Sequence, residues 1–335
     1  MNSPLIPDAV RKVAANCTDG IDSMPDGFAA AMPRVMRILS IEHEQQSGGW
    51  FRSRAVLFHQ RCSICVEWAS ITIDNDLSKH ALAEIRHEPV VQSVDGALLI
   101  HRLVPACHTI RSFNIFETIP FSWSKDRELV SRAVALWREL PAPLAGFVTS
   151  IFWDGPRFHR FVMGPSSIGD HHVGWSGNFR HSVDVAEHAR DIGQKTPLAD
   201  TSLLIAAGLL HDAAKADEYC YDRKRRAFRM SARGELVGHR DTLIEWMGVA
   251  RASVGDLIPE ETYLALLHII NATKAPPWLG LRDPRCLEAE ILSMVDRLSG
   301  MGDIYQRCAP AGGQSGFGKT NPRSGRRCYV TNKSK

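Results

Sequence analysis

The sequence predicts an α+β protein in which a small β-rich domain precedes an all-α helical domain. Short segments rich in β-branched and aromatic residues gather between residues 50 and 106, and helical apolar periodicity begins at about residue 123. Half of the fourteen histidines fall between His171 and His268, within the helical part. A chain of 335 residues is long enough for two domains with a sizeable core.

The first part of the chain predicts a lead-in and a compact β domain. Residues 1–48 are expected to form a lead-in segment with a short amphipathic helix over 28–41, closed by Ser47, Gly48 and Gly49. Residues 49–110 form the β-rich domain. Its predicted strands lie at 55–58, 65–73, 89–94 and 97–104, with turns at 74–76 and 95–96. A small barrel of the oligonucleotide-binding (OB) type is one candidate, and a simple β-meander is the alternative.

The second part predicts helices separated by proline and polar breaks. Ser124 is expected to cap a helix that Pro141 and Pro143 end, within a helical linker over 111–165. A helical domain then covers 166–308, and residues 309–335 form a flexible basic tail. We expect helices at 143–152, 180–193, 200–214, 234–251, 260–272 and 285–300, and irregular polar structure at 216–233.

An ordered series of histidines and aspartates indicates a metal site within these helices. His211 and Asp212 close the apolar run 203–210, which predicts a buried helix, and Lys215 follows. A carboxylate at the end of a buried helix must be paired or metal-bound, because bare burial costs several kcal/mol. A hydrogen bond to nearby backbone is the alternative for this pair. The series is completed by other residues of the same two types: His181, His239, His268 and Asp296.

The joint pattern resembles the HD superfamily of metal-dependent phosphohydrolases. The resemblance implies that His181, His211, Asp212 and Asp296 hold a divalent metal and that Lys215 lies near the substrate phosphate. His239 and His268 stand where members with a second metal carry further ligands. The cofactor implied is one or two divalent ions, with Mn, Fe, Co or Ni favoured over Mg by the imidazole ligands.

One subgroup of the superfamily is closer. Residues 164–181, with His171 and His172 before His181, resemble the leading segment of the YhaM-type 3′→5′ exoribonucleases and the TraI-type HD relaxases. Residues 234–239 and 113–120 favour the exonuclease side, whose members also carry an OB-like domain. The sequence departs from the subgroup pattern at Ser176, at 271–273 and at Ser299. The histidine pair that is missing at 271–273 argues against a full two-metal site and hence against full nuclease activity.

Roles for other residues follow from phosphoryl chemistry. A bound metal lowers the pKa of water and polarises a phosphoryl oxygen, and Lys215 would neutralise developing charge. His172 and Arg180 are candidates for catalytic contacts with substrate, although His171 or His172 could instead only brace its loop. His188 is expected on the surface. Residues predicted to bind substrate are His171 and three arginines of a basic cluster: Arg223, Arg225 and Arg226.

Composition narrows the setting of this chemistry. The net charge of +3 is mild, and neither a signal peptide nor a long apolar run is evident, so we expect a cytoplasmic protein with reduced thiols. We expect the partner to be nucleic acid, in the form of single-stranded RNA or DNA. We expect no association with a membrane, and a homo-oligomer is compatible with the sequence. Residues 313–320 fit a phosphate-loop pattern, but no following helix is expected, which favours a flexible tail instead.

These observations favour a metal-dependent phosphodiesterase acting on nucleic acid, most like a single-strand 3′→5′ exonuclease. In that hypothesis Trp68 or Phe58 of the β domain would stack on the strand. The alternatives are a relaxase-like DNA-processing protein of a mobile element, a small-nucleotide phosphohydrolase, and a catalytically weakened nucleic-acid-binding protein. No motif distinguishes RNA from DNA.

Overall fold

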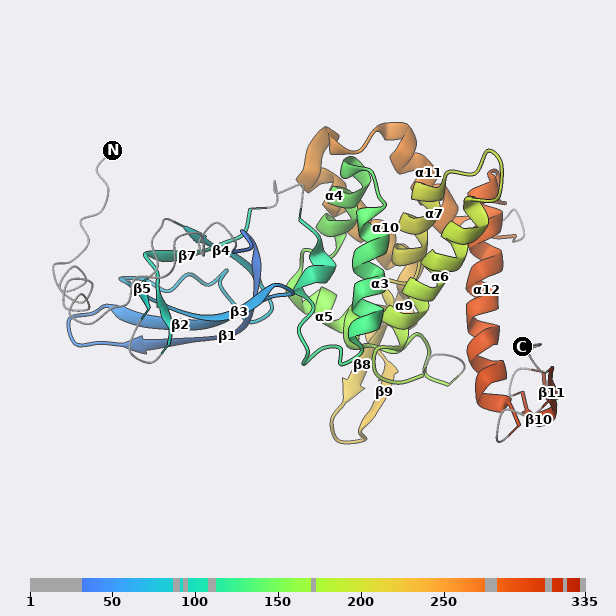
Figure 1. Cartoon of the computed structure of the whole chain (residues 1–335), viewed down its shortest axis with the longest axis horizontal. Coiled ribbons are helices and arrows are strands. Elements are labelled where there is room, and N and C mark those ends of the chain that lie inside the picture. Colours follow the sequence, from blue (N-terminus) through green and yellow to red (C-terminus); the bar gives the residue numbers. More distant parts are fainter. Residues whose placement is uncertain are drawn as a thin grey trace. The chain divides into compact units, whose positions relative to one another are not determined.

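The computed structural model describes residues 32–86, 91–92, 96–107, 113–169, 173–274, 282–310, 315–321 and 324–331. They divide into two compact units (Figure 1). The first contains the described residues up to 107 together with Glu117–Pro120, and the second contains 113–116 and the residues from Phe121 onward. The first unit is a β-sheet and the second is mainly helical, which confirms the α+β prediction.

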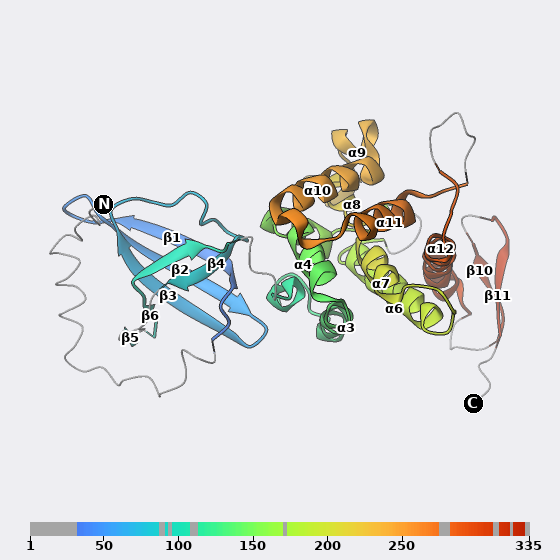
Figure 2. The same cartoon turned by 90° about the horizontal axis from the view of Figure 1, so that it is seen from above.

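The sheet of the first unit is curled into a half-barrel (Figure 2). Its strand order is β5-β6-β3-β2-β1-β4-β7. β6 runs parallel to β3, β7 runs antiparallel to β4, and only residues 100 and 101 separate β6 from β7. The chain itself therefore joins the two sides of the sheet, which is compatible with a partly open barrel of the OB type. The strands are β1 (Met36–Gln45), β2 (Phe51–His59), β3 (Cys62–Ser70), β4 (Leu82–Arg86), β5 (Val91–Gln92), β6 (Leu98–Leu99) and β7 (Arg102–Pro105).

Two expectations for the N-terminal unit are wrong. The helix predicted at 28–41 is replaced, in its described part, by β1, whose alternate residues Met36 and Ile38 enter the barrel core. Apolar residues at these spacings satisfy a strand as well as a helix, and pairing with β2 and β4 decides between them. Trp68 and Phe58 are each only 6% exposed, so neither can stack on a nucleic-acid strand.

The second unit is a bundle of helices with two small hairpins (Figure 1). Its first helix is capped by Asp126 rather than Ser124, because the Asp126 side chain accepts from the Leu129 backbone N–H. The elements that follow β7 along the chain are η1 (Ile115–Thr118), which has residues in both units, α3 (Arg127–Arg138), α4 (Ala142–Ile151), α5 (Gly155–Met163), α6 (Gly177–Gly193), α7 (Thr201–Leu210), α8 (Lys215–Glu218), β8 (Tyr219–Asp222), β9 (Ala227–Met230), α9 (Ala232–Leu236), α10 (Gly238–Val254), η2 (Gly255–Leu257), α11 (Glu260–Asn271), α12 (Leu287–Cys308), β10 (Gly316–Thr320) and β11 (Arg327–Val330).

The hairpins correct two further predictions. The segment expected to be irregular at 216–233 holds α8 and the β8–β9 hairpin, and the described part of the expected flexible tail holds the β10–β11 hairpin. Gly316–Thr320 of the phosphate-loop pattern is strand β10, which pairs with β11. Within the described ranges, no helix is long and apolar enough to cross a membrane.

The centre of the bundle is the contact between α6 and α7. Helix α7 is apolar along nearly its whole length and buried, and the Asp200 side chain caps its first turn. A Cβ atom at Gly208 would lie 2.5 Å from the Cα of Ala186, so the absence of a side chain lets the two helix backbones approach closely. This approach brings the start of α6 beside the end of α7.

Replacing Gly208 with alanine should therefore force α6 and α7 apart. We expect Gly208→Ala to destabilise the protein by about 1–3 kcal/mol, because the added methyl group meets backbone that cannot yield. Gly248→Ala is the matched control: it lies in α10 with open space around its Cβ position, and it should be neutral or stabilise by up to about 1 kcal/mol. Urea unfolding followed by circular dichroism measures both. Equal stability of the two variants would contradict the close-packing argument.

Candidate metal centre

Three helices place four polar side chains at one point of the bundle. His181 lies in the first turns of α6, His211 and Asp212 follow the end of α7, and Asp296 lies in α12. The Nε2 atom of His181 is 3.0 Å from Asp296 Oδ1, 3.2 Å from His211 Nε2 and 3.3 Å from Asp212 Oδ2. His211 Nε2 lies 3.6 Å from Asp212 Oδ2 and 3.7 Å from Asp296 Oδ1.

These separations match the ligands of a metal ion. Atoms that share a tetrahedral ion lie about 3.4 Å apart when each metal–ligand bond is about 2.1 Å. Ligand atoms of His181, His211 and Asp296 all lie within 4.8 Å of one another, and Asp212 contacts both imidazoles. His181 is fully buried, whereas the Asp296 side chain is 44% exposed. The centre is therefore shielded from solvent at His181 and accessible to solvent beside Asp296.

The second nitrogen of each imidazole sets the orientation of the ring. His211 Nδ1 lies 2.9 Å from the carbonyl oxygen of Gly208, which can only accept, so Nδ1 carries the proton and Nε2 keeps a lone pair. His181 Nδ1 lies 3.0 Å from the hydroxyl of Ser299. Both Nε2 atoms face the shared centre, which is the arrangement that metal-ligating histidines adopt.

The electrostatics of the centre favour a bound cation. Burial opposes charge on His181, but hydrogen bonds to Asp212 and Asp296 outweigh it and raise the His181 pKa to about 9. Burial would raise the pKa of Asp212, yet the charge of Lys215 and the hydrogen bond with His181 hold it well below its usual value. Burial also opposes the charge on Asp296, but hydrogen bonds with the two imidazoles lower its pKa as well. Both carboxylates are therefore ionised at neutral pH, and without a metal a proton on His181 supplies the compensating positive charge.

His239, at the start of α10, extends the centre on the far side of Asp212. Its Nε2 lies 3.4 Å from Asp212 Oδ1, while Asp212 Oδ2 faces His181 and His211. The Glu218 carboxylate lies 2.5 Å from His239 Nδ1 and orients the ring. The two carboxylate oxygens of Asp212 therefore face two neighbouring sites, one beside His181 and His211 and the other beside His239.

His268 is not part of this cluster among the described residues. Its Nε2 accepts a hydrogen bond of 2.9 Å from the backbone N–H of Arg285, before α12. Asn271 is the first residue of the segment 271–273, where the subgroup's histidine pair is missing. Its side-chain amide donates a hydrogen bond to the carbonyl of Leu267 in the same helix. The centre seen here therefore contains His181, His211, Asp212, His239 and Asp296.

Lys215 and Asn178 support Asp212 from opposite ends. The Lys215 ammonium lies 2.6 Å from Asp212 Oδ2 and 3.4 Å from the hydroxyl of Ser166. The Asn178 amide donates to the backbone carbonyl of Asp212 at 3.0 Å. Lys215 therefore places its positive charge at the edge of the metal centre.

The other residues predicted to contact the substrate do not all lie at the metal centre. Arg180 precedes His181 but points away from the centre, and its guanidinium pairs with Asp126 at 2.7 Å. The predicted catalytic role of Arg180 therefore has no support in this geometry. Arg225 and Arg226 are exposed in the turn between β8 and β9. His171 and His172 lie outside the described residues.

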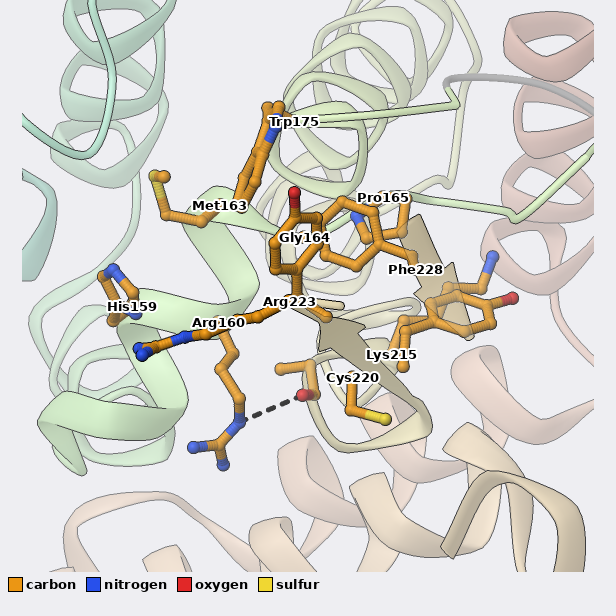
Figure 3. Close-up of a pocket in the computed structure, with 13 residues that line it drawn as sticks. His159, Arg160, Met163, Gly164, Pro165, Trp175, Lys215, Cys220, Arg223 and Phe228 are labelled. Atoms are coloured by element: carbon orange, nitrogen blue, oxygen red, sulfur yellow. Dashed lines mark hydrogen bonds between the residues drawn. The ribbon is translucent and has the colours of Figure 1, made fainter. Parts of the chain in front are cut away.

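A cavity of about 460 Å³ lies beside Lys215, between α5 and the β8–β9 hairpin (Figure 3). Arg223 is the one predicted substrate-binding arginine that lines it. Its other neighbours include the rings of Trp175, Tyr221 and Phe228. These aromatic residues were not singled out from the sequence, because the segment that holds two of them was expected to be irregular.

The structure shows the surroundings of Ser299 and Ser176, two departures from the subgroup pattern, and it adds Glu218. Ser299 stands where the subgroup has a carboxylate, and its hydroxyl keeps the contact with His181 Nδ1. Ser176 stands at a position where the subgroup has glycine, and its φ of +60° explains that preference. Glu218 had no sequence signal, because its link to His239 depends on the hairpin between them.

Comparisons with known proteins find an HD domain in the second unit. The HD domain model matches residues 178–301, so the predicted HD domain is confirmed over that range. Residues of this chain are 28% identical over 148 positions to 3′-5′ exoribonuclease YhaM of Bacillus licheniformis and, equally, to that of Halalkalibacterium halodurans. The match covers 44% of this chain and 46% and 45% of the two relatives, less than half of each. No solved structure matches significantly.

Removing the Ser299 hydroxyl should weaken metal binding without removing a ligand. We expect Ser299→Ala to lower the affinity for Mn²⁺ by about 10- to 100-fold, because the His181 ring loses the hydrogen-bond partner that orients it. Ser293→Ala, on an exposed position of the same helix, should leave the affinity unchanged. Isothermal titration calorimetry measures both. An unchanged affinity in Ser299→Ala would show that this contact does not orient the ligand.

Proposed function

We propose that this HD-domain chain is a metal-dependent phosphodiesterase that acts on nucleic acid, most like a single-strand 3′→5′ exonuclease. The observation that carries the proposal is the cluster of imidazole and carboxylate groups, open beside Asp296 and flanked by Lys215 and by a basic hairpin. The names of the two matched relatives, both 3′-5′ exoribonucleases, support nucleic acid as the substrate class.

The residues of the centre fit a divalent ion. His181, His211, Asp212 and Asp296 would hold the first ion, and Asp212 with His239 offers ligands for a second. Nitrogen and oxygen ligands in this mixture favour Mn, Fe, Co or Ni over Mg. When bound, such an ion supplies Lewis acidity toward water and toward a phosphoryl oxygen.

Lys215 is the residue of this chain best placed to act on the phosphate. Its side chain is only 11% exposed, and its ammonium already lies against Asp212. Charge neutralisation is strongest where water is excluded, so this cation would stabilise negative charge that develops on a phosphodiester at the centre.

The β8–β9 hairpin would guide the nucleic-acid backbone. Its turn and strand β9 carry exposed positive side chains, and the Asp222 carboxylate accepts from the backbone N–H groups of Lys224 and Arg225, which fixes the turn. Phosphate contacts by such residues make binding salt-dependent and sequence-independent. The positive residues are Arg223, Lys224, Arg225, Arg226 and Arg229.

Replacing Lys215 with methionine should separate catalysis from metal binding. We expect Lys215→Met to lower kcat on 5′-labelled single-stranded RNA or DNA by about 100- to 1,000-fold, because one preorganised charge at the phosphate is lost. Bound metal should persist, since all ligands remain. Lys195→Met, on an exposed residue after α6, is the control and should match the wild type. Gel electrophoresis of the products and metal analysis of each variant give both readouts.

The products also decide the type of activity. A ladder shortened progressively from the 3′ end supports the proposal. A single nick in supercoiled DNA would indicate a relaxase-like protein, and phosphate release from mononucleotides alone would indicate a nucleotide phosphohydrolase. No turnover with Mn²⁺, Fe²⁺, Co²⁺ or Ni²⁺ would leave a nucleic-acid-binding protein without catalytic activity.

A further inference from the structure

The cavity beside the metal centre combines an aromatic wall with a positive edge (Figure 3). Three rings meet there: Trp175 lies 4.9 Å from Tyr221 and 5.0 Å from Phe228, measured between centroids, and the two hairpin rings lie 5.2 Å apart. Trp175 precedes α6, whereas Tyr221 and Phe228 face each other across the β8–β9 ladder. Two segments far apart in the chain therefore build one aromatic cluster.

This cluster remains accessible although its rings contact one another. Trp175 is 56% exposed and Tyr221 is 38% exposed. Large aromatic surfaces left in contact with water beside a cavity are a usual mark of a binding site. The cavity of about 460 Å³ is within the range of small-ligand sites.

The other side of the cavity holds a cation that also contacts the metal centre. Lys215 lines the cavity, and its ammonium is 2.6 Å from the ligand candidate Asp212. Among the described residues that line the cavity, none is acidic, whereas Arg160, Lys215 and Arg223 are basic. Arg160 is paired with Asp217 and with the carbonyl of Ala216, and Lys215 is paired with Asp212. Arg223 is exposed at the edge of the cavity and can face a ligand. The cavity therefore suits a ligand that is flat and apolar at one end and anionic at the other.

We propose that this cavity holds the base of the nucleotide whose phosphate lies at the metal centre, with Trp175 as its main stacking surface. The proposal rests on the proposed function and adds a subsite to it. Stacking on aromatic rings is tolerant of sequence because every base has a π-face. The aromatic wall would accept each of the four bases, and it would position the terminal nucleotide of a single strand for attack.

A double-mutant cycle between the ring and the base tests this subsite. The probes are two 5′-labelled oligonucleotides that differ only at the 3′ end, one with a normal nucleotide and one with an abasic tetrahydrofuran residue. Wild-type protein should bind and cleave the abasic strand less well, by roughly 5- to 150-fold, because the stacked base is missing. Trp175→Ala should weaken the normal strand by a similar factor and should no longer distinguish the two strands.

Controls separate stacking from damage to the protein. Trp175→Phe should recover most of the discrimination, since a smaller ring still stacks. Phe317→Ala, which removes a 60%-exposed ring from β10, should behave as the wild type. The affinity of Trp175→Ala for Mn²⁺ should be unchanged. Binding is followed by fluorescence anisotropy without added metal, so that it does not depend on turnover.

The outcomes distinguish this subsite from the proposed function. If the wild type cleaves the strand and Trp175→Ala still distinguishes the normal from the abasic strand as well as the wild type does, the subsite is overturned. The nuclease proposal then stays in place. Base-dependent binding that Trp175→Ala abolishes, without turnover of any strand, would support the subsite and overturn the nuclease. Failure of the wild type both to discriminate and to turn over would overturn both.

Discussion

The contact between α6 and α7 is the constraint on which the candidate metal centre depends. The backbones meet at Gly208 and Ala186, closer than any side chain at position 208 would allow. The start of α6 lies beside the end of α7, so the Nε2 atoms of His181 and His211 lie 3.2 Å apart. The carbonyl of the same Gly208 accepts from His211 Nδ1. One glycine thus sets both the distance between the imidazoles and the tautomer of one of them.

The charges of the centre follow from that packing. Two carboxylates and two imidazoles share a largely buried volume, and positive charge is required to balance them. Lys215 supplies part of it from one side, and protonated His181 supplies the rest when no metal is bound. A divalent ion would replace that proton, so metal binding and the ionisation of His181 are coupled. The same Lys215 faces the aromatic cavity, which links the centre to the surface on which a substrate would lie.

The sequence allowed the ligand residues to be predicted better than their surroundings. His211 and Asp212 at the end of an apolar helix are informative because their burial needs a partner, and the resemblance to HD phosphohydrolases adds His181 and Asp296. The structure brings these four side chains together. Arg180 was misplaced because its neighbour His181 faces inward, which turns Arg180 toward Asp126. The strand β1 was read as a helix because a few apolar residues fit both periods. Ser299, Glu218 and Trp175 act through contacts distant in sequence, which no local pattern reports.

X-ray absorption spectroscopy of the 335-residue chain loaded with one equivalent of Mn²⁺ or Co²⁺ tests the central claim most directly, because it reports the atoms bound to the ion. Nitrogen and oxygen ligands with the multiple-scattering signature of two imidazoles are expected, and this imidazole signal should decrease in His211→Ala. A spectrum with sulfur ligands, or one without imidazole scattering, would contradict a centre built by His181, His211, Asp212 and Asp296.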